Sequence, residues 1–296
     1  MLTGVIQAIL SAFCFGMLAI LGKLAYARGF ATFEILQYRF GFAAVMLFVY
    51  ILATQRHILR AGPRTLVKAV VLGALFYPLQ SICFMSSLQY VSAATTSLIL
   101  YFYPVMVTIL SVLFFKARFD RTVVFSLILV MAGCGLVFFD AFLRSMSQTG
   151  ILLATMSMLV FSFYLICVHA MLKGENPRTV SFYVIVSAGL VYTVLAPPVG
   201  FLQLDGGSML LTLALGLIPT ALAVTLLYAS IEKIGSAFAS ICSTLEPIAT
   251  VLASAFVLGE DILAIQVGGM ALIMVGVALP NLRILGLRAP APPVAP

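Results

Sequence analysis

Charged residues are scarce in this chain of 296 residues, because Asp, Glu, Lys and Arg together make up only 8% of it. Soluble domains carry about 25% charged residues, since a folded surface has to be hydrated. The same chain is 63% hydrophobic and has a mean hydropathy of +1.20. This composition excludes an ordinary water-soluble protein and predicts a chain that folds in lipid.

Tryptophan, histidine and cysteine are also rare or missing: the chain has no Trp, two His and five Cys. The Cys residues are odd in number, and each lies in an apolar run where a thiol behaves as a small hydrophobic group. We therefore expect no disulfide framework. His57 and His169 belong to no HExxH sequence or cluster of metal ligands, so the sequence predicts neither a metal site nor another cofactor.

Two further absences narrow the class of protein. No charged residue precedes Lys23, so the first apolar segment lacks the basic start of a cleaved signal peptide, and we expect it to remain as a membrane span. No GxxxxGK[ST] sequence is present, which excludes a P-loop ATPase. The net charge of +7 comes from basic residues in short loops, so it indicates membrane topology and no nucleic-acid partner.

Apolar segments of membrane-spanning length fill most of the chain. A helix needs roughly 20 residues to cross about 30 Å of hydrocarbon. Cutting the sequence where charges, Gly or Pro cluster predicts ten transmembrane helices. Their expected limits are 3–25, 32–53, 66–88, 92–115, 122–141, 148–171, 179–201, 208–230, 236–258 and 263–283. The expected fold is an all-α membrane protein.

Basic residues are distributed unevenly between alternate loops. One set of loops, with the C-terminal tail, holds twelve Lys and Arg residues, and the opposite set holds only Lys23, Arg28 and Arg144. Because Lys and Arg accumulate on the cytoplasmic side, we predict that both termini are cytoplasmic. The predicted location is the bacterial cell inner membrane. The expected partners are the lipid bilayer and a small-molecule substrate, and a second copy of the chain is a further candidate.

The second half of the sequence repeats the first. One constant offset pairs Ser87 with Ser230, Ala94 with Ala237, Ser97 with Ser240, Pro104 with Pro247 and Gly133 with Gly276. We therefore predict two five-helix repeats, residues 1–145 and 146–285, followed by a disordered Pro-rich tail, residues 286–296. Because five is odd, the second repeat enters the membrane from the opposite side, as in many secondary transporters with inverted repeats.

Several short motifs point to one family. They are Phe15 and Lys23, Arg39, LQYVSAATTSLILYFYPV (88–105), LEPI (245–248), LGED (258–261) and GGMALIMVGVAL (268–279). With these motifs the chain resembles the drug/metabolite transporter superfamily, specifically its ten-helix EamA-type branch, along nearly its whole length. The resemblance implies a transporter that exports amino acids, other metabolites or toxic compounds.

Three of the ionisable residues within predicted spans are candidates for transport, because a charge exposed to lipid costs about 2.5–3.5 kcal/mol and so normally faces the protein interior. Glu246 lies about midway along the ninth span, and it is a candidate proton carrier or a partner for a substrate ammonium group. Arg39, about one third of the way into the second span, is a candidate partner for a substrate carboxylate. His169, near the inner end of the sixth span, is a candidate proton relay. A structural ion pair, hydrogen bond or interfacial anchor is the alternative for each.

Polar and aromatic side chains recur at helical spacing in the same spans. Tyr77, Gln80, Ser81 and Phe84 lie at i, i+3, i+4 and i+7 and so share one helix face. Tyr103 occupies in the first repeat the place that Glu246 has in the second. The residues that we expect to bind substrate are Gln7, Ser11, Arg39, Tyr77, Gln80, Ser81, Phe84, Tyr101, Tyr103, Phe161, Tyr164 and Thr244, with Glu246 and His169 as proton-coupling candidates.

These residues predict a polar and aromatic cavity at mid-membrane and a secondary transporter that works by alternating access. The leading hypothesis is an exporter of amino acids or related small metabolites, with proton coupling left open. A multidrug or toxic-cation exporter of the same fold is the alternative. An intramembrane enzyme is disfavoured because the sequence offers no nucleophile with a base and no set of metal ligands, so we expect no catalytic residues.

Overall fold

The computed structural model describes residues 1–54, 56–87, 89–91, 93–117, 121–139, 147–195, 204–258 and 262–284. Every regular element in these ranges is a helix, which confirms the expected all-helical fold for this part of the chain. The elements are α1 (Leu2–Ala27), α2 (Thr32–Thr54), the 3₁₀ turn η1 (Arg56–Leu59), α3 (Pro63–Val71), the π-turn η2 (Leu72–Phe76), α4 (Tyr77–Ser87), α5 (Ala93–Leu100), α6 (Tyr103–Phe115), α7 (Arg121–Val137), α8 (Gln148–Met171), α9 (Pro177–Leu195), α10 (Gly206–Gly216), the π-turn η5 (Leu217–Leu222), α11 (Ala223–Ser243), α12 (Glu246–Leu258) and α13 (Ala264–Ile284). The predicted tail, residues 286–296, lies outside the described residues.

Seven helices in the described part of the chain are long and apolar enough to cross a membrane, and Arg121–Val137 and Ala264–Leu279 form shorter apolar helices. One of the seven, Gly206–Ser243, has 38 residues and covers the predicted span 208–230 and the first part of the predicted span 236–258. Its backbone leaves the helical conformation at Gly235, where φ is +79° and ψ is 163°, a region that glycine enters without a steric penalty. The count of ten spans therefore stays a prediction.

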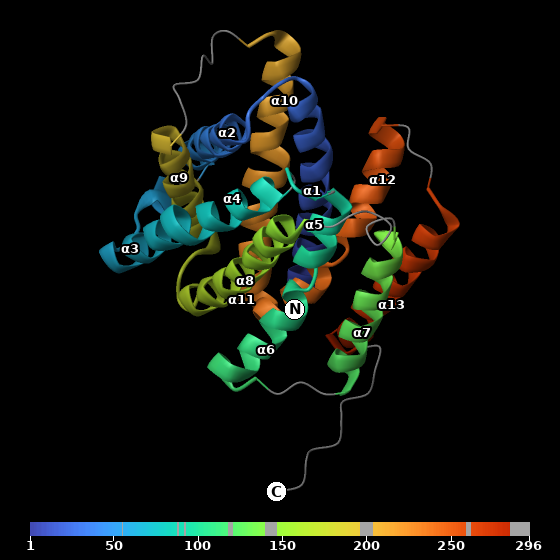
Figure 1. Ribbon diagram of the computed structural model, residues 1–296. Helices are drawn as coiled ribbons and strands as arrows, with labels where there is room; N and C mark the ends of the chain where they lie inside the picture. Colours follow the sequence, from blue (N-terminus) through green and yellow to red (C-terminus); the bar gives the residue numbers. More distant parts are fainter. Residues whose placement is uncertain are drawn as a thin grey trace, which may run out of the picture.

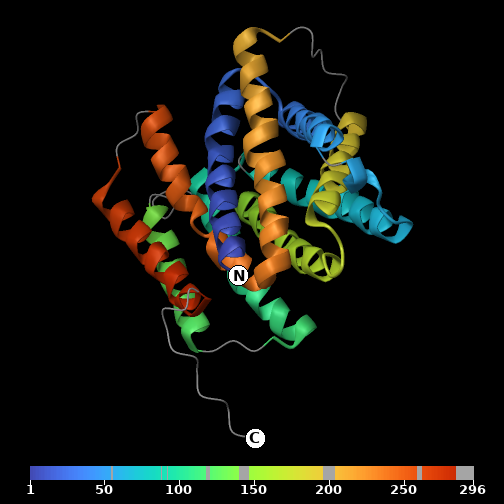
Figure 2. The same ribbon diagram turned by 180° about the vertical axis from the view of Figure 1, so that it is seen from behind.

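The helices pack with partners from distant parts of the sequence. In Figure 2 the chain of α10 and α11 descends beside α1 and then turns back toward α12. Helix α1 packs against α11 and α12, α2 against α9, and α4 against α8. In Figure 1, α7 and α13 lie together at one side of the bundle. A Cβ atom placed on Gly133 of α7 would lie 2.7 Å from the carbonyl oxygen of Gly269, so small residues let these two helices approach closely.

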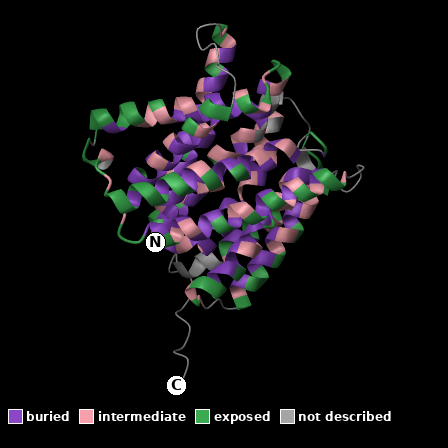
Figure 3. Ribbon diagram, turned by 60° about the vertical axis from the view of Figure 1, so that its left-hand side comes forward, coloured by how far each residue is buried: buried purple, intermediate pink, exposed green. Residues whose placement is uncertain are grey.

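The outer faces of the helices are apolar, as expected of surfaces that meet lipid. Side chains such as Phe256, Val194 and Leu210 are 88%, 83% and 70% exposed. Many hydroxyl and amide side chains, by contrast, are buried between the helices. Figure 3 shows the buried residues on the faces that the helices turn toward one another. This arrangement inverts the pattern of a soluble protein, with polar side chains facing the protein interior.

Polar contacts join the two halves of the chain at their ends. Arg28, after α1, donates a hydrogen bond to the Ser208 hydroxyl at 3.1 Å and lies 3.7 Å from the Asp205 carboxylate. Asp205 caps α10, and hydrogen bonds from the Ser208 side chain and from the backbone N–H groups of Ser208 and Gly207 lower the pKa of its carboxyl below the usual value. Elsewhere the Thr65 hydroxyl donates to Glu175 at 2.6 Å.

Candidate functional site

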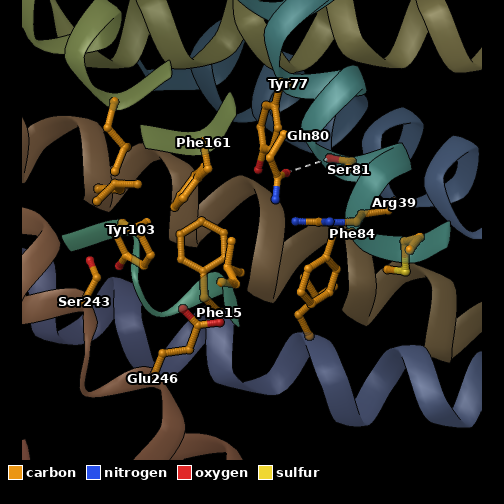
Figure 4. A pocket seen from close by; sticks show the side chains of 15 residues that line it. Phe15, Arg39, Tyr77, Gln80, Ser81, Phe84, Tyr103, Phe161, Ser243 and Glu246 are labelled. Carbon is orange, nitrogen blue, oxygen red and sulfur yellow. Dashed lines mark hydrogen bonds between the residues drawn. The ribbon is translucent and has the colours of Figure 1, made fainter. Parts of the chain in front are cut away.

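One cavity lies inside the bundle, between helices of both halves (Figure 4). It measures about 60 Å³, counted as the space open to the centres of water molecules. Its lining residues are Phe15, Leu18, Arg39, Tyr77, Gln80, Ser81, Phe84, Met85, Leu100, Tyr103, Phe161, Leu165, Leu227, Ser243 and Glu246. The lining thus contains one cation, one carboxyl group, a few neutral polar groups and many apolar and aromatic side chains.

Glu246 is the first residue of α12, at a break in the helical chain. Helix α11 ends at Ser243, and Thr244 and Leu245 form a turn before α12 begins. Pro247 explains the break, because proline has no N–H to donate and its ring clashes with the preceding helical turn, whereas the first turn of a helix tolerates it. The carboxyl group of Glu246 consequently lies at a helix N-terminus, where negative charge is favourable, and within hydrogen-bonding reach of the Tyr101 side chain.

The first half of the chain has an equivalent break. The predicted fourth span, 92–115, consists of α5 and α6, which are separated at Tyr101 and Phe102. Helix α6 starts at Tyr103 and Pro104, the residues that the repeat pairs with Glu246 and Pro247. The predicted spans 92–115 and 236–258 are thus each interrupted before a proline, which starts a new helix. Both breaks place the first side chain of the new helix on the cavity lining.

Arg39 enters the cavity from α2, and its side chain is 3% exposed. Its Nε donates to the hydroxyl oxygen of Thr220 at 2.7 Å, and its Nη2 donates to the carbonyl oxygen of Pro219 at 3.2 Å. The guanidinium also lies 5.1 Å from the centre of the Phe40 ring. These contacts supply the hydrogen-bond partners and the aromatic face that a buried guanidinium needs.

Arg39 and Glu246 do not pair with each other. They belong to α2 and α12, and Figure 4 shows their charged ends on different walls of the cavity. Within the described part of the chain no ion pair within 4 Å joins them. The cavity therefore offers a positive and a negative group at separate places, each able to receive a complementary group of a bound molecule.

The neutral polar groups of the cavity come mainly from α4. The face predicted from Tyr77, Gln80, Ser81 and Phe84 lies entirely on the cavity. The Gln80 amide donates to the Ser157 hydroxyl at 3.1 Å, which anchors this face to α8. Helix α4 follows the π-turn η2, whose wider turn rotates the residues that come after it.

The aromatic side of the cavity is formed by Phe15, Tyr103 and Phe161. The rings of Tyr103 and Phe161 meet edge to face, with their centres 5.0 Å apart. The Tyr103 hydroxyl donates to the carbonyl oxygen of Ser240 at 3.4 Å, so the apolar face of its ring is left to line the cavity. Aromatic rings at this spacing present a rigid apolar surface to a bound molecule.

Eight of the residues predicted for the site line this one cavity: Arg39, Tyr77, Gln80, Ser81, Phe84, Tyr103, Phe161 and Glu246. Four others are buried behind its wall. Among these, Tyr101 stacks on Phe138 and Tyr164 forms a short hydrogen bond with Tyr228. The hydroxyls of Ser11 and Thr244 donate to the backbone carbonyls of Ala223 and Ile241, at 2.7 and 2.5 Å.

Gln7 and His169 lie away from the cavity, in contact with other parts of the chain. The Gln7 amide oxygen accepts a hydrogen bond from Lys233 at 2.9 Å. His169 Nδ1 lies 3.1 Å from the Ser236 hydroxyl, and the imidazole lies 4.6 Å from the Phe115 ring. Both contacts flank Gly235, where the chain turns. Neither residue reaches a molecule bound in the cavity in this conformation.

Phe15, one of the family-motif residues, also lines the cavity, and six further lining residues were not predicted: Leu18, Met85, Leu100, Leu165, Leu227 and Ser243. Five of them are apolar, and in a chain so rich in apolar residues nothing in the sequence separates a cavity-facing leucine from a lipid-facing one. Ser243 could have been predicted from the sequence, because it lies one turn before Pro247, where the helix has to break. For metals, the described residues contain no group of three or more His, Cys, Asp or Glu that could hold an ion.

Comparison with known proteins places the chain in a family. The model of the EamA-like transporter family matches residues 2–139 and, a second time, residues 148–282. The chain belongs to the EamA-like transporter family. The resemblance inferred from the sequence is thereby confirmed, and this EamA-like protein is a membrane transporter of small molecules with a two-repeat architecture.

Structural comparison agrees with this assignment at the level of fold. A solved structure titled "Crystal structure of protein" has a TM-score of 0.77 to the EamA-like transporter and is 18% identical in sequence. The match covers 97% of this chain and 99% of the other. At this identity the likeness shows a common fold alone. A comparison with curated proteins finds no match.

Proposed function

We propose that this EamA-like transporter exports amino acids or closely related zwitterionic metabolites across the bacterial inner membrane, by alternating access between its two halves. One observation carries the proposal: Arg39 and Glu246 line the same cavity with a guanidinium and a carboxyl group, and no ion pair within 4 Å joins these two described residues. Ionisable groups at membrane depth are costly, and they are commonly retained where they have a function.

An amino acid matches this pair of charges. Its carboxylate suits the planar guanidinium of Arg39, which offers parallel N–H groups, and its ammonium group suits the carboxylate of Glu246. The remaining wall, with Phe15, Phe84 and Phe161, suits an apolar or aromatic side chain. All three parts of the solute thus find complementary groups on the lining.

The alternative, an exporter of toxic cations, is less compatible with Arg39. A cation without a carboxylate would gain from Glu246 but would meet the guanidinium as a like charge in a poorly hydrated cavity, where such repulsion is strong. The same residue therefore favours a zwitterion over an amine.

The size of the cavity suits a small solute. A volume of 60 Å³ holds about four to six waters, since each needs roughly 10–15 Å³ of such space. At about 30 Å³ of liquid for each water, this corresponds to roughly 120–180 Å³, the scale of a single small metabolite. We infer that the halves separate to admit the solute and close again around it, with rocking of the two repeats as the motion.

Counterflow into proteoliposomes tests the proposal. We expect vesicles preloaded with an unlabelled amino acid to accumulate the labelled one, and an amine that lacks the carboxylate to compete poorly. Inverted vesicles with an imposed amino acid gradient then report the direction of flux. Equal competition by the amine, or uptake of cationic dyes without any effect of amino acids, would refute transport of zwitterions.

A further inference from the structure

The Arg39 guanidinium is held by a π-turn in the other half of the chain. In this turn, η5, Pro219 has no N–H and cannot make the usual helical hydrogen bond to the carbonyl oxygen of Leu215. The Thr220 hydroxyl donates to that carbonyl instead, at 2.9 Å. The single hydroxyl hydrogen of Thr220 is therefore already used within its own helix.

The Thr220 oxygen can consequently act only as an acceptor toward Arg39. It receives the Nε–H of Arg39 at 2.7 Å, the shorter of the two hydrogen bonds that the guanidinium makes with η5. The second hydrogen bond goes to the Pro219 carbonyl oxygen. In an α-helix this oxygen would accept from the N–H of Ala223, but in the wider π-turn that N–H donates to the Ile218 carbonyl. The Pro219 carbonyl is therefore free to accept from Arg39. Two fixed acceptors define the plane of a guanidinium.

A further polar side chain near Arg39 comes from the equivalent position of the first half. The offset that pairs Ser87 with Ser230 also pairs Tyr77 with Thr220. Tyr77, which lies directly after the π-turn η2, is within hydrogen-bonding reach of the Arg39 side chain. The guanidinium is thus within reach of two residues that are related by the repeat, one with a phenol and the other with an aliphatic hydroxyl.

The remaining end of the guanidinium is directed at the cavity. Figure 4 shows the end of the Arg39 side chain between Gln80 and Phe84, beside the open space. Thr220 itself does not line the cavity; its side chain is completely buried. Its effect on a bound molecule therefore has to pass through Arg39.

We propose that Thr220 is a positioning residue that aims the free N–H groups of Arg39 at the carboxylate of the substrate. This inference rests on the proposed transport of zwitterions and adds a specificity-determining contact to it. Without the Thr220 acceptor, the guanidinium would rotate to satisfy its Nε–H elsewhere and would present a different edge to the substrate. The loss should affect carboxylate recognition and leave recognition of the ammonium group unchanged.

The test compares Thr220→Val, Thr220→Ser and wild type in counterflow, with an amino acid and its decarboxylated amine as competing substrates. Thr220→Val removes the acceptor at nearly constant volume, and we expect about a tenfold loss of apparent affinity for the amino acid, the usual scale for a hydrogen bond to a charged group. Competition by the amine should not change. Thr220→Ser keeps the oxygen and should behave as wild type.

Thr212→Val is the matched control. Thr212 is also buried in this stretch, but its hydroxyl bonds only to its own helix, at Ser208 and Met209, at 2.9 and 3.0 Å. We expect it to leave the ratio of amino acid to amine affinity unchanged. If Thr220→Val does not fold, Thr220→Ala removes the same oxygen without adding a methyl group beside the guanidinium.

Two kinds of failure are distinguishable. If Thr220→Val weakens amino acid and amine equally, or matches wild type while Arg39→Gln abolishes the preference for the carboxylate, then Thr220 has no positioning role and only this inference is overturned. If wild type shows no preference for the amino acid over the amine, the proposed function itself is wrong, and the inference falls with it.

Discussion

At the scale of single residues, Arg39 and Glu246 are the two charged groups on the cavity lining. Substitution of each residue has a different side effect. Removing Arg39 takes away the group proposed to bind the carboxylate but also leaves the Thr220 hydroxyl oxygen and the Pro219 carbonyl without the donor that they share. Removing the charge of Glu246 leaves its place at the start of α12 intact. Substitutions of Arg39 and Glu246 are therefore expected to have different effects on transport.

We expect Arg39→Gln to lower the apparent affinity for an amino acid by tenfold or more, roughly the effect of losing a charge-assisted pair, and to affect its amine analogue far less. Counterflow with both substrates measures this. Arg28→Gln is the matched control, because Arg28 also donates to a hydroxyl of the second half, that of Ser208, but lies outside the cavity. Equal losses for both variants would argue against a carboxylate site at Arg39.

We expect Glu246→Gln to abolish the response of transport to an imposed pH gradient and to lower the apparent affinity for the amino acid, with counterflow still measurable at saturating substrate. The reason is that glutamine keeps the shape and hydrogen-bonding capacity of the side chain but cannot bind or release a proton. Flux in proteoliposomes with and without a pH difference measures it, with Glu175→Gln, whose partner is Thr65, as the control. An undiminished response in Glu246→Gln would remove Glu246 as the proton carrier.

For single residues, the sequence predicts which ionisable groups face the cavity better than it predicts how the other polar side chains pack. Arg39 and Glu246 could be found because a charge within an apolar span is rare and expensive. The Tyr77 to Phe84 face could be found from its helical spacing. Ser11, Tyr164 and Thr244 are polar residues in similar positions that instead bond to neighbouring helices or to their own backbone, a choice that depends on packing which the sequence does not reveal.

At the scale of helices, matching irregularities occur in both halves. The third predicted span of each repeat contains a π-turn, η2 in one and η5 in the other, and the span after it is interrupted before a proline. Each π-turn packs closely against the second span of the other half, η2 against α9 and η5 against α2. Tyr192 of α9 donates to the Pro78 carbonyl just after η2 at 3.3 Å, as Arg39 of α2 donates to the Pro219 carbonyl in η5. The repeat thus governs backbone geometry as well as sequence.

Glycines make these close approaches possible. A Cβ atom on Gly73 would lie 2.3 Å from the Val184 carbonyl oxygen, and one on its repeat partner Gly216 would lie 2.7 Å from the Phe42 Cβ. We expect Gly73→Ala and Gly216→Ala each to destabilise the fold by about 1–3 kcal/mol, the usual cost of overpacking. Thermal unfolding in detergent measures this.

Gly41→Ala is the control for both glycines, since nothing lies within 4 Å of its added methyl group. In the middle of helix α2 this change should be neutral or should stabilise by about 0.5–1 kcal/mol. If Gly73→Ala were as stable as Gly41→Ala, the close approach of α9 to η2 would not hold in solution.

Helix positions could be predicted from the sequence to within a few residues, and helix continuity could not. Hydropathy places the spans because the apolar length is set by the bilayer. The π-turns depend on a shift of one backbone hydrogen bond, which leaves no trace in hydropathy. Hydropathy also fails to predict the connection at Gly235. A loop is expected there between the spans 208–230 and 236–258, but the structure has a single non-helical residue.

At the scale of the whole molecule, the two halves interlock through Ser11 with Ala223, Thr65 with Glu175 and Arg28 with Asp205. The predicted boundary of the repeats near residue 145 lies outside the described residues. The inverted orientation of the halves and the side of the termini stay predictions from loop charges. These can be tested without knowing the substrate.

We expect a membrane-impermeant maleimide to label Tyr90→Cys on intact cells and to label Arg60→Cys only after the membrane is opened. The reason is that basic loops such as the one with Arg60 remain in the cytoplasm, whereas Tyr90 lies in the loop after the next span. Both positions are exposed, and Tyr90 is 51% exposed. Unmodified protein, whose five cysteines all lie in helices, is the baseline. The reverse pattern of labelling would invert the proposed topology.

The position of Phe15 on the cavity wall offers a way to observe conformational changes of the protein directly. The chain has no Trp, so Phe15→Trp would introduce the only indole in the molecule, directly on the lining of the cavity that is proposed to bind the solute. Indole fluorescence shifts to the red as its surroundings become wet. The opening and closing of the transporter could then be followed by emission in real time, without a label and without background.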